Sequence, residues 1–195
     1  MILYRSNFNL DTDTLDGLID KVNGNPDRLG KDGMYTTYFT KMVEDREEVV
    51  FVDQYKEAIA KGLSYLGLQH RCSYVFDHWM QVYGAGNIGH PPHDHYCGQA
   101  LVSWIHFARP TSTKAMYFLD SDNNKRYPQQ NWGDFIMFSP WMLHGVDSVP
   151  AEDARTIIAG NVYIKELVCP STDEINLYYT FDGETSVCRQ IEAVL

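Results

Sequence analysis

The sequence has no long hydrophobic run, few cysteines and a deficit of positive charge, and each of these absences excludes a class of protein. No apolar stretch approaches the roughly 18 residues of a membrane span, and the N-terminus does not resemble a signal peptide. The four cysteines form no C-x-x-C pair, which argues against a zinc knuckle or a thioredoxin-like site. A net charge of −10 disfavours nucleic acids and anionic membranes as partners. We therefore expect a cytoplasmic protein with no membrane segment.

The 195 residues fit a single domain, along which the apolar pattern changes once. Residues 1–71 are predicted to form a helical part, because Leu15–Val22 and Val52–Leu68 have apolar residues at helical spacing. Residues 72–165 contain short β-branched and aromatic runs separated by turn residues, which predicts a β core. Residues 166–195 are expected to be an appendage that completes a sheet or forms an oligomer contact, such as that of a homodimer. The strands are predicted at Tyr74–Tyr83, Ala100–Phe107, Ala115–Leu119, Asp134–Phe138, Arg155–Ile164 and Ile175–Phe181.

The order of these elements favours one fold class. Many short strands with turns between them are typical of a sandwich or barrel, and not of a parallel α/β sheet. Since the helices precede the strands, we expect an α+β protein whose N-terminal helices pack on the outside of one sheet. Those helices should carry no catalytic residue.

Three of the seven histidines lie within six positions, in the segment Gly89-His-Pro-Pro-His-Asp-His95. In an extended segment His93 and His95 point to the same face, whereas Asp94 points away unless a bulge intervenes. A third imidazole, His144, follows an apolar strand and a proline turn and could return beside the pair. Imidazole suits iron, zinc, copper and nickel, and three protein ligands leave positions open for substrate and oxygen. Because imidazole must be neutral to coordinate, metal occupancy should fall as the pH drops through roughly 6.

An arginine opens the apolar strand that follows. Arg155 lies eleven residues after His144 and begins the run Thr-Ile-Ile-Ala-Gly-Asn161. An arginine entering an apolar strand is costly unless it meets an anion, and its planar fork fits a carboxylate with two hydrogen bonds. An ion pair with one of the many acidic residues is the structural alternative to a ligand contact. Together with the histidines, Arg155 favours an anionic ligand.

The stretch from Trp79 to Asn161 resembles the iron(II)- and 2-oxoglutarate-dependent oxygenase superfamily. The resemblance rests on the order of several segments: a Trp-containing strand, Pro-Pro-His-x-His, Arg109-Pro110, Phe118-Leu-Asp, the Gly133 to His144 segment, and Arg155 followed by Asn161. It covers about 80 residues and is most similar to the small, mainly bacterial and phage branch. It implies a double-stranded β-helix core of the jelly-roll, cupin-like kind, with Fe(II) as metal and 2-oxoglutarate as cosubstrate.

By this resemblance His93 and His144 are iron ligands and Arg155 holds the distal carboxylate of 2-oxoglutarate. The superfamily usually has a carboxylate at the second position, where this chain has His95. This departure leaves the metal's identity open and keeps Asp94 as the alternative ligand. The resemblance implies a hydroxylase that uses O2 and acts on a small-molecule or peptide substrate.

Further residues near these motifs are candidates for contacts in the site. Tyr83, Asn87 and Asn161 are predicted to contact the cosubstrate, and Trp141 and Gln99 to line the pocket. His90 precedes two prolines, and a role beside the metal ligands is expected for it.

Two other classes of function remain open. His93-x-His95 followed by Gln99 resembles the first metal motif of cupins, with Gln99 where cupins usually place glutamate. A cupin-like metal-binding protein, or a three-histidine dioxygenase that does not use 2-oxoglutarate, would hold zinc, nickel, manganese or iron, and Arg155 would be structural. The other class is a structural β domain that binds no metal.

Overall fold

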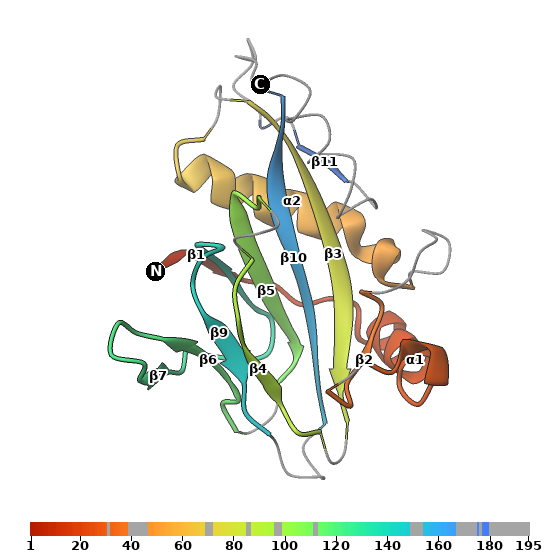
Figure 1. Cartoon of the computed structure of the whole chain (residues 1–195). Helices are drawn as coiled ribbons and strands as arrows, with labels where there is room; N and C mark the ends of the chain where they lie inside the picture. Colours follow the sequence, from red (N-terminus) through yellow and green to blue (C-terminus); the bar gives the residue numbers. More distant parts are fainter. Residues whose placement is uncertain are drawn as a thin grey trace.

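A computed structural model of the chain has two β-sheets that face each other, with helices on the outer side of the larger sheet (Figure 1). The structure describes residues 1–30, 32–38, 47–68, 72–84, 87–95, 99–110, 113–148, 154–166, 175 and 177–179. Its elements are β1 (Ile2–Asn7), α1 (Thr12–Val22), η1 (Pro26–Arg28), β2 (Tyr35–Thr36), η3 (Glu47–Phe51), α2 (Val52–Tyr65), β3 (Ser73–Tyr83), β4 (His90–His93), β5 (Val102–Arg109), β6 (Met116–Leu119), β7 (Lys125–Arg126), β8 (Asp134–Phe138), β9 (His144–Val146), β10 (Arg155–Glu166) and β11 (Leu177–Tyr179).

The two sheets have the strand order of a double-stranded β-helix. Within the described residues the larger sheet has seven strands in the order β1-β8-β5-β10-β3-β11, and β2 pairs with β3 beside that path. The smaller sheet has the order β4-β9-β6-β7. All pairs are antiparallel except β11 with β3. Because the strands from β3 to β10 alternate between the two sheets, apart from β6 and β7, which both belong to the smaller one, residues distant in sequence meet in the space between the sheets. The predicted α+β jelly-roll class is confirmed.

Strand alternation divides the side chains of the larger sheet between two cores. One face, which includes Trp104 and Ile158, packs against the helices. The other face, which includes Ile105 and Ile157, packs between the two sheets. Side chains of a strand point alternately to opposite faces, so each long strand serves both cores. The N-terminal helices therefore lie on the outside of one sheet, as predicted.

The two helices have the local signals that the sequence predicts. Asp11 caps α1, its carboxylate accepting a hydrogen bond from the Thr14 backbone N–H at 2.9 Å. The α2 helix has no side-chain cap. It is held by its buried face, on which Tyr55, Ile59 and Leu63 are fully inaccessible to solvent. Tertiary burial thus replaces capping in α2.

The prediction of a purely helical N-terminal part was incomplete. Ile2–Asn7 forms β1, which pairs with β8 at the edge of the larger sheet, and Tyr35–Thr36 forms β2 against β3. The predicted strands of the β core are present, and within the predicted strand Ile175–Phe181 the residues Leu177–Tyr179 form β11, whereas residues 176, 180 and 181 lie outside the described residues. This strand adds to the larger sheet, so the described portion of the C-terminal segment completes a sheet. No helix in the described ranges has the length and apolar character needed to cross a bilayer.

Candidate metal centre

Three histidines from two strands and a following loop converge at one end of the space between the sheets. His93 ends β4 and His144 begins β9, and the two are directly paired across the β4–β9 ladder. His95 lies two residues beyond β4, where its backbone N–H donates to the Pro140 carbonyl at 2.7 Å. One ring nitrogen from each of the three lies within 4.8 Å of the other two. Such a cluster has the size of a three-ligand metal site.

The local sequence explains why β4 can present its histidines in this way. The ladder shifts register between His90 and His93, and the exposed prolines between them cannot donate ladder hydrogen bonds. Gly89 has a φ of +88°, and a Cβ there would lie 2.3 Å from the Val146 carbonyl oxygen. Only glycine combines that φ with so close an approach. The backbone just before β4 therefore lies in close contact with β9.

Hydrogen bonds fix which ring nitrogen of each histidine is free. The Nδ1 atoms of His93 and His144 lie 3.0 and 2.9 Å from the carbonyl oxygens of Pro91 and Met142. The Nδ1 of His95 lies 2.7 Å from the Asn161 Oδ1. A neutral imidazole that donates from Nδ1 keeps its lone pair on Nε2. All three rings therefore offer Nε2 as the ligand atom, with the outer hydrogen bond that metal-binding histidines usually make.

Apolar burial keeps these imidazoles neutral. The ring of Trp79 lies 6.1 Å from that of His95, and the Phe138 and Phe118 rings lie 5.1 and 6.1 Å from that of His144. Desolvation lowers the pKa of His93 to about 4 and that of His144 to about 3, and it also lowers the pKa of His95. Neutral imidazole is the form that coordinates metals. At physiological pH no proton has to leave these rings before a metal binds.

The carboxylate of Asp94 is not part of this cluster. The side chain of Asp94 is exposed, as strand alternation predicts, and the group of convergent ligands found among the described residues consists of the three histidines. His90 lies beside the group, its ring centroid 4.4 Å from that of His93 and its Nδ1 bonded to the Asp32 carboxylate. The arrangement therefore favours His95 over Asp94 as the third ligand.

Arg155 is buried without a partner for much of its guanidinium. It is 2% exposed, and its Nε and Nη2 have no hydrogen-bond acceptor in the structure. The guanidinium carbon lies 4.4 Å above the centre of the Tyr83 ring. Burial lowers the arginine pKa, although arginine remains charged at any physiological pH. Side chains of a strand alternate between its two faces, so residues an even number of positions apart share a face. Arg155 and Asn161 are six positions apart and both lie on the inner face of β10. A buried cation with unused donors and a metal cluster thus face the same interior.

The remaining predicted site residues have varied positions. Asn161 accepts the hydrogen bond of His95, so the structure gives its side chain a contact with a candidate ligand. Asn87 bonds backbone groups at both ends of its amide, namely the Asp32 carbonyl and the Gly89 N–H. The contacts predicted for Tyr83, Asn87 and Asn161 with a cosubstrate remain predictions. Gln99 is exposed, and Trp141 is 63% exposed in the turn before His144.

Ser103 was missed by the sequence reasoning. Its hydroxyl donates to the Asn161 Oδ1 at 2.8 Å and lies 3.0 Å from the His95 Nδ1. It is fully buried on the inner face of β5. The available signal was a lone serine within an apolar strand, because a buried hydroxyl needs a partner.

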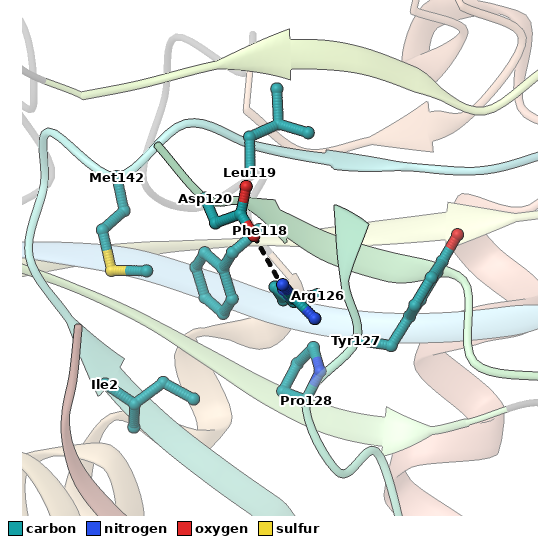
Figure 2. A pocket seen from close by; sticks show the side chains of 8 residues that line it. All are labelled: Ile2, Phe118, Leu119, Asp120, Arg126, Tyr127, Pro128 and Met142. Carbon is teal, nitrogen blue, oxygen red and sulfur yellow. Dashed lines mark hydrogen bonds and ion pairs between the residues drawn. The ribbon is translucent and has the colours of Figure 1, made fainter. Parts of the chain in front are cut away.

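A groove adjoins the metal cluster on the side of the smaller sheet. Figure 2 shows the Arg126 guanidinium joined to Asp120 and flanked by Phe118, Pro128 and Tyr127, with Ile2 and Met142 on the other side of Phe118. The cavity has a volume of about 320 Å³. Leu119, Asp120 and Tyr127 complete its lining. The three histidines are not among its lining residues, but Phe118 pairs with His144 in the β6–β9 ladder, so the groove lies next to the cluster.

The arrangement of strands matches that of known enzymes. One is a Trichoplax adhaerens prolyl hydroxylase in complex with a peptide fragment of hypoxia-inducible factor, with a TM-score of 0.58, 11% identity, and coverage of 83% of both chains. A 2OG-Fe(II) oxygenase family protein from Burkholderia pseudomallei has a TM-score of 0.57 and 12% identity, covering 85% of this chain and 80% of that one. A Pseudomonas putida prolyl-4-hydroxylase has a TM-score of 0.56 and 14% identity, covering 81% and 90%. The chain has the 2OG-Fe(II) oxygenase fold.

This oxygenase fold is recognisable from structure and not from overall sequence similarity. No protein-family model matches the sequence, and a search of curated proteins finds no relative. Identities of 11–14% establish the shared fold alone. Within the oxygenase fold, the chemistry has to be argued from the residues of this chain.

Proposed function

We propose that this chain is an iron(II)- and 2-oxoglutarate-dependent oxygenase, in its simplest form a hydroxylase of a small molecule or a peptide. The observation that carries the proposal is the convergence of His93, His95 and His144 with every Nδ1 already hydrogen-bonded. The fold supports it, because solved structures with this fold include a 2OG-Fe(II) oxygenase family protein and prolyl hydroxylases.

The donor set fits a catalytic metal. Three neutral imidazoles suit Fe(II), and a three-residue site leaves coordination positions for other ligands. The aromatic side chains around His95 and His144 exclude water from the protein side of the site. In the proposal His93, His95 and His144 hold the iron, and Asn161 and Ser103 orient His95.

The two unsatisfied nitrogens of the guanidinium fit a dicarboxylate cosubstrate. Buried donors without acceptors are costly, and a carboxylate that accepts from both Nε and Nη2 would remove that cost. The ring of Tyr83 fixes the plane of the guanidinium from one side. Arg155 therefore binds and orients the distal carboxylate of 2-oxoglutarate, while its keto-acid end faces the histidines.

The bound iron and 2-oxoglutarate would supply the oxidation, in which O2 converts 2-oxoglutarate to succinate and CO2 and hydroxylates a substrate C–H bond. The chain's own residues position the metal and the cosubstrate and exclude water from the site. The histidines would hold the metal, and Trp79, Phe118 and Phe138 keep water from the space beside them. Arg155 would orient the cosubstrate through its distal carboxylate.

The test is an anaerobic titration of 2-oxoglutarate into the iron-loaded wild type and Arg155 variants, followed by visible absorption. Removing one member of a buried charge pair costs on the order of 2–5 kcal/mol, so Arg155→Ala should weaken binding roughly 30-fold to several-thousand-fold. Arg155→Lys keeps the charge but loses the fork and should give an intermediate loss. The iron content should be unchanged in both.

Arg109→Ala is the matched control, because Arg109 pairs with Asp16 on α1 and lies over the Trp132 ring, outside the metal centre. Equal 2-oxoglutarate affinity in the wild type and Arg155→Ala would refute the cosubstrate assignment. Iron retention with no 2-oxoglutarate binding at all would instead favour a three-histidine dioxygenase or a cupin-like metal protein.

A further inference from the structure

We propose that the groove beside the metal centre binds the non-reacting part of the substrate, and that this part is an apolar chain ending in a carboxylate. This inference rests on the proposed oxygenase function for the identity of the ligand as a substrate. The groove itself is defined by Ile2, Phe118, Leu119, Asp120, Arg126, Tyr127, Pro128 and Met142.

The groove neighbours the metal centre through two of its lining residues. Phe118 is the ladder partner of His144, and its ring centroid lies 6.1 Å from the imidazole. Met142 accepts the Nδ1 hydrogen bond of the same histidine through its carbonyl oxygen. A ligand lying on these two side chains is therefore close to the His144 ring, on the side away from its coordinating nitrogen. That position suits a non-reacting part of a substrate, which anchors the molecule during the reaction.

Most of the lining favours an apolar body of limited size. Five of the eight lining residues have apolar side chains, namely Ile2, Phe118, Leu119, Pro128 and Met142 (Figure 2). A volume of about 320 Å³ is at the small end of ligand pockets, and such pockets combine apolar walls with a few polar groups. This size favours a small molecule with a chain of several methylene groups.

The polar lining residues of the groove are Asp120, Arg126 and Tyr127, and the cation, Arg126, has a 70% exposed side chain that is held in place by Asp120. Arg126 donates through Nε to the Asp120 Oδ2 at 2.8 Å, which fixes the guanidinium and leaves its terminal nitrogens unused among the described contacts. The other oxygen of Asp120 already accepts the backbone N–H groups of Asp122 and Asn124. The preceding cation, Lys125, is engaged elsewhere, with Asp147 and over the Tyr117 ring.

These contacts favour a ligand with a negative charge. A ligand cation would meet a guanidinium, whereas a ligand carboxylate can accept from the terminal nitrogens of Arg126. The chain as a whole carries a net charge of −10, so its average surface repels an anion. Binding of an anionic ligand in the groove would therefore depend on Arg126.

The experiment uses octanoate as the probe and selectively ¹³C-methyl-labelled Ile, Leu and Met as reporters. Octanoate should shift the methyl signals of Ile2, Leu119 and Met142, and octylamine should not. Arg126→Gln should weaken octanoate binding about two- to five-fold, the effect of losing an ion pair that is largely exposed to solvent. Arg109→Gln is the control and should leave the affinity unchanged. Equal affinity for octanoate and octanol, or for wild type and Arg126→Gln, would overturn the carboxylate assignment.

A second measurement tests the position of the groove relative to the metal. With Mn(II) in the histidine site, octanoate protons should relax faster than with Zn(II), and Arg126→Gln should lower this effect by reducing occupancy. Octanoate that binds without enhanced relaxation would overturn the link between groove and metal. The proposed oxygenase function is refuted by a different result, namely an unchanged 2-oxoglutarate affinity in Arg155→Ala. That result does not depend on whether octanoate binds in the groove.

Discussion

The orientation of His95 by Asn161 and Ser103 gives a quantitative prediction for metal affinity. The His95 Nδ1 lies 2.7 Å from the Asn161 Oδ1 and 3.0 Å from the Ser103 hydroxyl, so the ring N–H has two neighbouring acceptors. Losing the outer partner of a metal-binding histidine typically lowers affinity 10–100-fold, or about 1.4–2.8 kcal/mol. Because either acceptor can replace the other, Asn161→Ala and Ser103→Ala should each cost less than ten-fold. The double variant should show the full loss.

The assay is anaerobic competition for Fe(II) between the protein and a chromophoric chelator. Co(II) absorption in parallel reports whether the coordination geometry persists. The two single losses should sum to less than the loss in the double variant, as expected for groups that share one partner. Asn7→Ala removes a similar amide that bonds the Trp132 carbonyl and the Asp134 carboxylate, and it should leave the affinity unchanged. A folded double variant with wild-type affinity would refute the orientation of His95 through Nδ1.

The remaining predictions concern protonation and packing. Because burial lowers the pKa of His93 to about 4 and that of His144 to about 3, bound iron should persist well below pH 6 and dissociate nearer pH 4. The iron content after dialysis measures this, and half-dissociation at pH 6 would contradict the burial argument. The same lowered pKa values mean that the unfolded chain takes up protons first, so the apoprotein should lose stability as the pH falls below 6.5 toward 4. A Cβ at Gly160 would lie 2.1 Å from the Asp77 carbonyl oxygen, so Gly160→Ala should lower the free energy of unfolding by about 1–3 kcal/mol or more in urea denaturation. Gly17 in α1 has open space around it, so Gly17→Ala should instead stabilise by about 0.4–1 kcal/mol, and equal effects at both positions would refute the packing argument.

The convergence of the three histidines could be predicted because its signal is local. The i, i+2 spacing of His93 and His95 places both on one face, and the ladder with His144 follows from the strand order. The expectation that metal would be lost near pH 6 used the pKa of a free imidazole. The lowered pKa values of His93 and His144 move the predicted pH downward, because the aromatic surroundings of His144 come from β6 and β8, which the local sequence does not reveal.

The strands that were missed are those without a local signal. Ile2–Asn7 is too mixed in polarity to be distinguished from coil, and it becomes a strand because β8 offers an edge. The β4 strand contains two prolines, which count against a strand in any propensity scale. Both β1 and β4 form because they pair with another strand. In contrast, α1 and β10 could be predicted because their own residues show the apolar pattern of a helix or a buried strand.

The position of β1 has a practical consequence for work on this protein. Ile2 forms part of the groove, and the Met1 ammonium contacts the Met142 sulfur two residues before His144. Anything fused ahead of Met1 therefore emerges at the entrance to the groove. An N-terminal affinity tag would compete with ligands there, so binding measurements call for a tag that is removed, with tagged and cleaved protein compared in the same titration.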